Sequence, residues 1–551
     1  MLMRSTVVKA PVPAIWEPWL LVAITLACLA PFISKPAHID DPLFIWTARH
    51  IVSDPGNFYG FNVHWYSTPQ PMSVVMQNPP LASYYMALAG SCLGWSEVAL
   101  HIAFLPWAVA VVLGVYYLAR EFCGHPFLAA LASLAAPAFL VSSTSLMCDV
   151  MMLAFWVWAV FLWMRGLAAR NNLLLFIAML LAAASTLAKY FGLSLAPLLV
   201  VYAIMTQRRA GWWNVHLCFF VLVLAGYEVW SHYLYGKDLL FGAVNYATQM
   251  RVGGNWQSKV ATGLCFTGGC LALVLFAIPL LWGWRGTAIA AGGTVLLALI
   301  LGVNKSVAGH SVVVGGGMDW LFIWQWAIFV AGGAAVLALA ACDLARNRDA
   351  KSTMLFLWIG GSFFFASLCN WTVAARNILP MTPAAAFLLV RGLENSKPSP
   401  ARALRLIWCP WALALALSLY VALADFQLAG LGKTAAESLH EKLGPLFKSV
   451  YFEGHWGFQY YLQQLGGIPL DKSNMHLSPT DAVILPLGNS NIFPLSQRDA
   501  ALWNELDLQY PARVAIMSGP AGAGFYSDGW GPAPYLIGPP PVERYLIYRG
   551  Q

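Results

Sequence analysis

The sequence predicts an α-helical polytopic membrane protein with a large first outside loop and a small C-terminal α/β domain. Of its 551 residues, 59% are hydrophobic and only 10% are charged, whereas about a quarter of the residues in a soluble protein are charged. The mean hydropathy is +0.65. Long apolar runs occur over most of the chain and must be helices in lipid, because a helix satisfies its backbone polar groups within one segment. The alternating pattern of an outer-membrane barrel is absent.

About thirteen apolar segments are expected to be transmembrane. They lie near 16–34, 98–118, 126–141, 150–168, 171–188, 191–206, 212–235, 262–283, 287–303, 320–341, 353–371, 377–391 and 405–424. Three of them, at 126–141, 191–206 and 377–391, are shorter than the roughly 20 residues of a full span. We expect these three to be tilted, partly re-entrant or longer than drawn. The first is expected to be a retained span, since it has no small-x-small cleavage site and leads directly into "PAHIDD".

Basic residues in short loops predict the orientation. Arg4 and Lys9 precede the first segment, which favours a cytoplasmic N-terminus. Alternate threading from there places thirteen further basic residues inside: Arg120, Arg165, Arg170, Arg208, Arg209, Arg285, Arg346, Arg348, Lys351, Arg391, Lys397, Arg402 and Arg405. The net charge of +7 is therefore explained by inside loops, and no nucleic-acid binding is expected.

Three outside segments, 35–97, 236–261 and 304–319, are longer than simple turns. The chain therefore divides into a membrane domain, 1–424, and an outside C-terminal domain, 425–551. In the latter, "DAVILPL" and "RVAIMSG" are typical of buried strands between turns rich in Pro and Gly. All ten cysteines precede residue 410 without metal-ligand spacing, so they are expected to be buried apolar side chains.

Five ionisable residues at the predicted outside face are candidates for chemistry, since such residues are costly and rare at a membrane surface. They are Asp40, Asp41, Asp149, Lys189 and Arg376. An acid at a water-lined surface can act as a general base on an acceptor hydroxyl. Adjacent acids point in different directions, so Asp41 either caps the helix that begins near Pro42 or acts as a supporting acid.

The two cations have a structural and a functional interpretation. Both Lys189 and Arg376 are suited to snorkelling at the membrane boundary. However, Lys189 interrupts an apolar stretch and Arg376 precedes a proline-broken helix, and cations in such breaks are suited to binding a phosphate. Similarly, "QNPPL" is either a simple turn or an elbow that presents Gln77 and Asn78 to a cavity.

No motif supports a soluble nucleotide-sugar or ATP as substrate. The "GGG" at 315–317 lacks the Lys and the strand–helix context of a phosphate loop, and there is no GxSxG or HExxH motif.

Five stretches together resemble the GT-C glycosyltransferases, and most closely the family 39, protein-O-mannosyltransferase-like bacterial enzymes that include the aminoarabinose transferases of lipid A. They are "DDPLFIWTARHI", "QNPPLASYYMAL", "SLMCDVMMLAFWVWAVFLWMRGL", "LAKYFGLSLAPLLVVYA" and "ARNILPMTPAAAFLL". The tail segments 455–467 and 522–535 also look like those of some bacterial members. The resemblance implies a GT-C fold in a bacterial cytoplasmic membrane, with the large loop and the C-terminal domain in the periplasm.

The resemblance also implies a reaction and residue roles. Such enzymes move a sugar from a polyprenyl-phosphate donor to a protein, glycan or lipid acceptor, usually with inversion. Asp40 takes the position of the family's general base and Asp41 that of its second acid, usually Glu. Lys189 takes the position of the lysine that meets the lipid phosphate. Arg376 is a second phosphate contact, and Asp149 matches an acid whose role varies within the fold.

Two departures and two alternatives stay open. The aminoarabinose group often has a charged residue before the proline pair, where this chain has Gln77-Asn78, so the lipid A acceptor is not carried over. Some GT-C enzymes use a divalent metal; here no dense carboxylate cluster is seen, which favours metal independence. The alternatives are a secondary transporter, which the absence of an inverted repeat disfavours, and a non-catalytic protein that binds a lipid carrier.

Overall fold

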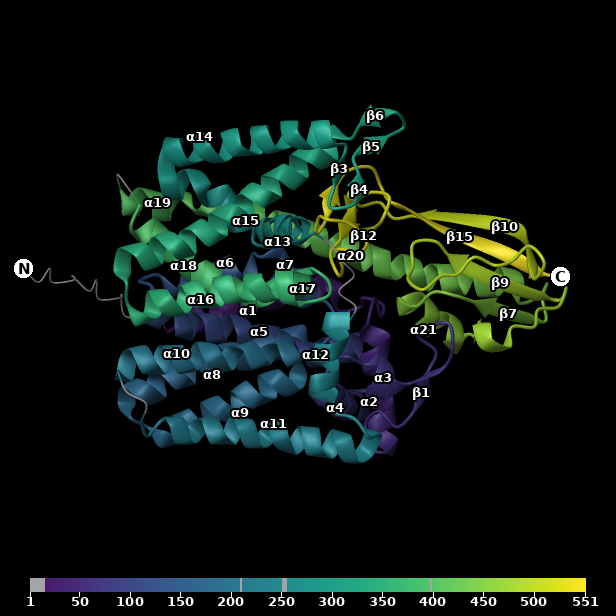
Figure 1. Cartoon of the computed structure of the whole chain (residues 1–551), viewed down its shortest axis with the longest axis horizontal. Coiled ribbons are helices and arrows are strands. Elements are labelled where there is room, and N and C mark those ends of the chain that lie inside the picture. Colours follow the sequence, from purple (N-terminus) through teal and green to yellow (C-terminus); the bar gives the residue numbers. More distant parts are fainter. Residues whose placement is uncertain (1–14, 209–210, 250–254, 397–398) are drawn as a thin grey trace, which may run out of the picture.

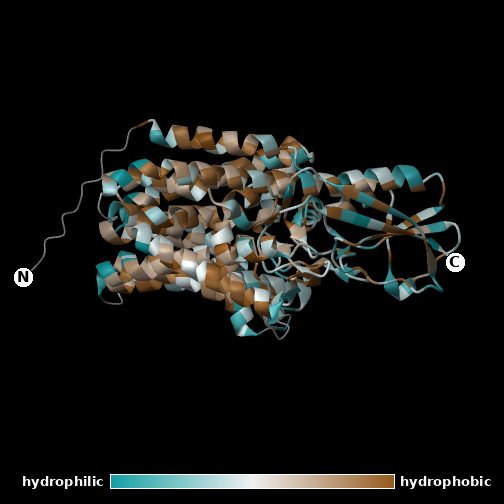
Figure 2. Ribbon diagram, turned by 90° about the horizontal axis from the view of Figure 1, so that it is seen from above, coloured by the Kyte–Doolittle hydropathy of each residue, from teal (hydrophilic) through white to brown (hydrophobic). Residues whose placement is uncertain are grey.

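The computed structural model describes residues 15–208, 211–249, 255–396 and 399–551. Four of the basic residues used above for the orientation, Arg4, Lys9, Arg209 and Lys397, lie outside the described residues. A helical bundle forms one part of the molecule, and a domain containing a β-sheet projects from one end of it (Figure 1). Hydrophobic residues dominate the bundle, whereas the projecting domain mixes both kinds (Figure 2).

The first half of the bundle contains the helices that surround the first large loop. They are α1 (Glu17–Leu29), η1 (Ala30–Phe32), α2 (Asp41–Ser53), α3 (Met72–Val75), α4 (Leu81–Leu93), α5 (Glu97–Phe122), α6 (Pro126–Leu134), α7 (Pro137–Ser142), α8 (Asp149–Ala169), α9 (Asn172–Ala188), η2 (Tyr190–Ser194), α10 (Leu195–Gln207), α11 (Asn214–Tyr235) and α12 (Leu239–Gln249).

The remaining helices complete the bundle and enter the C-terminal domain. They are α13 (Trp256–Cys270), α14 (Ala272–Asn304), α15 (Trp320–Asn347), α16 (Ala350–Phe364), η3 (Phe365–Cys369), α17 (Ala375–Ile378), η4 (Leu379–Met381), α18 (Thr382–Glu394), α19 (Pro400–Leu406), α20 (Trp408–Leu443), α21 (Trp456–Gln464) and η5 (Lys472–Asn474).

Among the described residues, eight helices are long and apolar enough to cross a membrane, and three shorter helices are also apolar. The segments expected to be irregular are interrupted. Residues 126–141 form α6 and α7, separated before Pro137, and 377–391 is divided among α17, η4 and α18 around Pro380. Proline removes a backbone donor and disfavours helix in the preceding residue, which explains both breaks. Gly283, with φ 61° and ψ −161°, bends α14 where a loop between two spans was expected.

Short hairpins decorate the loops of the bundle. In the first loop β1 (Asn62–Val63) pairs with β2 (Gln70–Pro71). Between α14 and α15, β3 (Ser306–Val307) pairs with β4 (His310–Ser311), and β5 (Val313–Val314) pairs with β6 (Gly317–Met318).

The C-terminal domain contains a five-stranded mixed sheet in the order β10-β15-β9-β7-β8. Its strands are β7 (Ser449–Phe452), β8 (Ile468–Pro469), β9 (Asp481–Pro486), β10 (Ala500–Gln509) and β15 (Val542–Gly550). β7 is parallel to β8 and β9, and β15 runs antiparallel to β9 and β10. Helix α21 connects β7 to β8, as a parallel crossover requires. The predicted α/β domain is therefore confirmed, with "DAVILPL" as the fully buried central strand β9.

The segment from 514 to 537 leaves this sheet and returns to the bundle. It contains β11 (Val514–Ala515) paired with β14 (Leu536–Ile537), and β12 (Met517–Ser518) paired with β13 (Ala523–Gly524). Two indole and phenol bonds tie it down: Trp326 Nε1 donates to Pro532 O at 2.9 Å, and Tyr535 Oη donates to Gly269 O at 2.9 Å. The two domains therefore share contacts well beyond their covalent connection.

The end of the bundle far from the sheet gathers ion pairs between helix ends. Glu121 accepts from Arg165 at 3.0 Å and lies 3.7 Å from Lys351, and Arg391 lies 3.0 Å from Asp343. These cations belong to the set that the sequence places on the inside, so the charged helix ends cluster at one face of the bundle.

Candidate active site

Asp40 and Arg376, 336 residues apart in the sequence, form an ion pair at the sheet-side end of the bundle. One guanidinium nitrogen of Arg376 (Nη1) donates to Asp40 Oδ2 at 2.7 Å. The two side chains are 20% and 22% exposed, so a substrate can reach them. Arg376 Nη1 also lies 3.6 Å from the sulfur of Met147. The helices η3 and α17 on either side of residues 370–374 hold Arg376 in an irregular break of the bundle.

A second pair lies next to the first through the neighbour of Arg376. Lys189 Nζ donates to Asp149 Oδ1 at 2.5 Å and lies 3.4 Å from the side-chain oxygen of Asn377. Asp149 opens α8, where the helix N-terminus favours a negative charge. Lys189 follows the last residue of α9, and the turn after it is tight, because a Cβ on Gly192 would lie 2.5 Å from the backbone of Ser185. The structure therefore brings four of the five predicted ionisable residues into two adjacent pairs.

Asp41 orients the turn that presents Asp40. Its Oδ2 accepts from His38 N at 3.0 Å and its Oδ1 accepts from Leu146 N at 2.9 Å. The turn needs this support, since Ile39 adopts the left-handed region with φ 47°, which is strained for a β-branched residue. The expected N-cap role of Asp41 is wrong: α2 begins at Asp41 itself, and its carboxylate points back to His38.

Asp41 is fully buried, and burial raises its pKa to about 7 against the opposing effects of Lys35 and the two backbone N–H groups. Near neutral pH this carboxyl therefore exchanges its proton. Since both oxygens accept N–H bonds, the ionised form is the one that holds the turn.

The elbow residues lie beside the pairs without joining them. Asn78 Oδ1 is 3.7 Å from Cys148 Sγ, next to Asp149, and Asn78 O accepts from Tyr59 Oη at 2.5 Å. Gln77 Nε2 donates to Val74 O at 2.7 Å, within its own turn. Pro79 and Pro80 are buried ahead of α4.

A sealed cluster under Asp40 was not predicted. Lys35 and Asp425, both fully buried, form an ion pair. Asp425 Oδ2 accepts from Tyr526 Oη at 2.9 Å, and Asp425 Oδ1 lies 3.5 Å from His38 Nε2. Burial lowers the pKa of His38 to about 4, so its imidazole is neutral. The signal in the sequence is Asp425 itself, the first acid after a long apolar run, since such acids usually have a partner.

Metal-ligand side chains do not gather at the site. Across the described ranges, no group of three His, Cys, Asp or Glu side chains is arranged to hold a metal ion. Asp40 and Asp149 each face a cation rather than another carboxylate.

Comparisons with known proteins agree with the resemblance seen in the sequence. Residues 77–233 match the family model described as dolichyl-phosphate-mannose-protein mannosyltransferase. This match covers the elbow, Asp149 and Lys189, and it confirms the resemblance to the GT-C glycosyltransferases. No curated protein matches the chain.

Several solved structures share the arrangement at low sequence identity. Crystal structures of ArnT from Cupriavidus metallidurans are 15% identical: the apo state covers 85% of this chain and 92% of its own (TM-score 0.43), and the undecaprenyl phosphate complex covers 86% and 94% (TM-score 0.44). The apo oligosaccharyltransferase of Archaeoglobus fulgidus is 14% identical, covering 83% of this chain and 64% of its own (TM-score 0.49).

Proposed function

We propose that this chain, a GT-C glycosyltransferase, moves a sugar from a polyprenyl-phosphate-linked donor to an acceptor hydroxyl at the sheet-side face of the membrane. Asp40 is the general base, and Lys189 and Arg376 bind the donor phosphate. The observation that supports this best is the reachable ion pair of Asp40 and Arg376, at 2.7 Å, beside the pair of Lys189 and Asp149.

Both proposed phosphate ligands hold a carboxylate in the absence of substrate. A phosphate has geometry and charge similar to a carboxylate and accepts the same charge-assisted hydrogen bonds. When the donor binds, its phosphate replaces Asp40 on Arg376 and Asp149 on Lys189. The exchange leaves Asp40 free to accept a proton, so the base becomes available only with a donor in place.

The transfer itself is one displacement. The acceptor oxygen forms a bond to the anomeric carbon while the bond from that carbon to the phosphate oxygen breaks. The acceptor proton passes to Asp40, and the electron pair leaves with the polyprenyl phosphate, whose negative charge Lys189 and Arg376 stabilise. Because two cations supply this charge, we propose that transfer does not require a divalent metal, and activity should survive a chelator.

The proposed location follows from the basic helix ends. We place the chain in a bacterial cytoplasmic membrane, with its N-terminus in the cytoplasm and the site and C-terminal domain in the periplasm. The acceptor is then a protein, glycan or lipid of the envelope.

The variant Asp40→Asn tests the assignment of the base. It keeps the size of the side chain but cannot accept the proton. We expect the transfer rate to fall about 10²–10⁴-fold, while the purified variant still binds polyprenyl phosphate. Full activity in Asp40→Asn would show that another group is the base.

The activity itself is tested by mass spectrometry of envelope lipids, glycans and proteins from cells with and without this chain. We expect one sugar to be missing from one fraction. An unchanged envelope would instead favour a transporter or a carrier-binding protein.

A further inference from the structure

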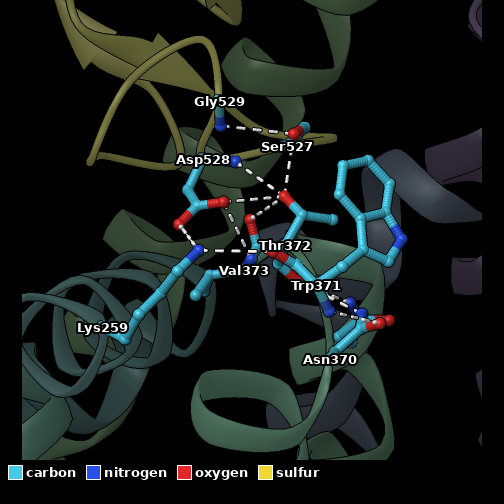
Figure 3. Close-up of polar contacts among 9 residues, drawn as sticks. Lys259, Asn370, Trp371, Thr372, Val373, Ser527, Asp528 and Gly529 are labelled. Atoms are coloured by element: carbon cyan, nitrogen blue, oxygen red, sulfur yellow. Dashed lines mark hydrogen bonds and ion pairs between the residues drawn. The ribbon is translucent and has the colours of Figure 1, made fainter. Parts of the chain in front are cut away.

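Asp528, in the segment that returns from the C-terminal domain, holds the strand-like stretch before Arg376 (Figure 3). Its Oδ1 accepts from Thr372 Oγ1 at 2.7 Å and from Val373 N at 3.0 Å, and its Oδ2 accepts from Lys259 Nζ at 2.7 Å. Its own N–H donates to Val373 O at 2.8 Å. One largely buried side chain thus fixes both strands of this contact and uses both of its carboxylate oxygens.

The contact continues to the residues of the candidate site. Ala375 N donates to Phe525 O at 2.8 Å, so the chain is held on both sides of Ala374. Asn377 Nδ2 donates to Thr372 O at 3.3 Å, which closes the stretch on itself. Arg376 lies within this short closed segment, and its direction depends on where the tail holds the segment.

The same tail segment also supports the other member of the pair. Tyr526 donates to Asp425, which pairs with Lys35 and lies beside His38. His38 begins the strained turn that presents Asp40, and its ring packs edge-on against that of Tyr526, with centroids 5.9 Å apart. Residues 525–528 therefore contact the supports of both Asp40 and Arg376.

The loop that carries these residues is itself tightly closed. Gly524 N donates to Ala533 O at 2.8 Å. A Cβ on Gly531 would lie 1.9 Å from the carbonyl carbon of Gly522, so the two backbones cross in contact. Such a loop transmits position rather than absorbing it.

We propose that segment 525–528 of the C-terminal domain completes the donor site, and that Asp528 is a positioning residue that acts through Arg376. This rests on the proposed role of Arg376 as a phosphate ligand. The C-terminal domain then sets the donor affinity of a site formed by side chains of the bundle.

The test measures binding of polyprenyl phosphate to the purified full chain in lipid nanodiscs. Asp528→Asn removes the charge and one acceptor oxygen while keeping the shape. We expect about tenfold weaker binding, the effect of losing a charge-assisted contact, with the unfolding temperature and the acceptor KM unchanged. The matched control is Asp507→Asn, which breaks an exposed pair with Arg544 in the same domain and should bind as the wild type.

A double-mutant cycle with Arg376→Ala separates positioning from general destabilisation. If Asp528 acts through Arg376, adding Asp528→Asn to Arg376→Ala causes no further loss, whereas independent effects multiply. Multiplying losses, or wild-type binding by Asp528→Asn, overturn the inference alone. Wild-type binding by Arg376→Ala overturns the phosphate site as well. If Asp528→Asn does not fold, Thr372→Val removes one donor to the same carboxylate, and a smaller loss in the same direction is expected.

Discussion

Two ion pairs at the same end of the molecule have the same chemistry and opposite accessibility. The Lys35 and Asp425 side chains are fully buried, whereas Asp40 and Arg376 are 22% and 20% exposed. Both pairs join residues more than 300 positions apart. A buried pair that lost one partner would leave an uncompensated charge, while a reachable pair can exchange one partner for a substrate. The first pair is therefore expected to support the fold and the second to bind and react.

The largest effect should follow from breaking the sealed pair. Lys35→Met leaves the carboxylate of Asp425 buried without its cation, and we expect a loss of about 3–5 kcal/mol in the free energy of unfolding. Chemical denaturation of the purified chain measures this. The double variant Lys35→Met/Asp425→Asn should regain most of the loss, because no unpaired charge remains. A single variant as stable as the wild type would mean that water reaches Asp425.

Lys189→Ala tests the reachable side with an intermediate effect. Removing one charge-assisted contact to the donor phosphate should weaken polyprenyl phosphate binding by about 1.5–3 kcal/mol. The control is Lys433→Ala, which removes a lysine paired with Glu97 at 2.9 Å, away from the site contacts. Equal affinities of Lys189→Ala and wild type would remove Lys189 from the donor site.

Glu543 offers the smallest effect and a titration with a definite sign. This carboxyl of β15 is 9% exposed, and burial alone raises its pKa from 4.5 to about 8. The folded chain therefore keeps a proton that the unfolded chain releases between these values. Its contribution to stability is fully present below pH 4.5 and is lost as the pH rises through 8, by up to about 1.4 kcal/mol per pH unit.

The variant Glu543→Gln should remove this part of the pH dependence. The measurement is the thermal unfolding midpoint of wild type and variant from pH 5 to 9, and we expect the variant to lose less stability toward high pH. Parallel curves would show that Glu543 is solvated in the folded chain.

The sequence was sufficient for the architecture because helices in lipid follow directly from apolar runs, and prolines mark their breaks. It also identified Asp40, Asp149, Lys189 and Arg376 as exceptions in an apolar chain. It could not pair them, since the contact of Asp40 with Arg376 depends on packing between distant segments. Lys35 was missed because a lysine at the end of a span is usually solvated.

The long helix α20 (Trp408–Leu443) determines how this protein can be divided. It runs across the predicted domain boundary after residue 424 without a break and contributes Asp425 to the sealed cluster. The C-terminal domain is therefore not an exchangeable module. A chimera that swaps acceptor specificity between related enzymes would have to exchange α20 and residues 522–535 together with Lys35, because any narrower graft separates a buried charge from its partner.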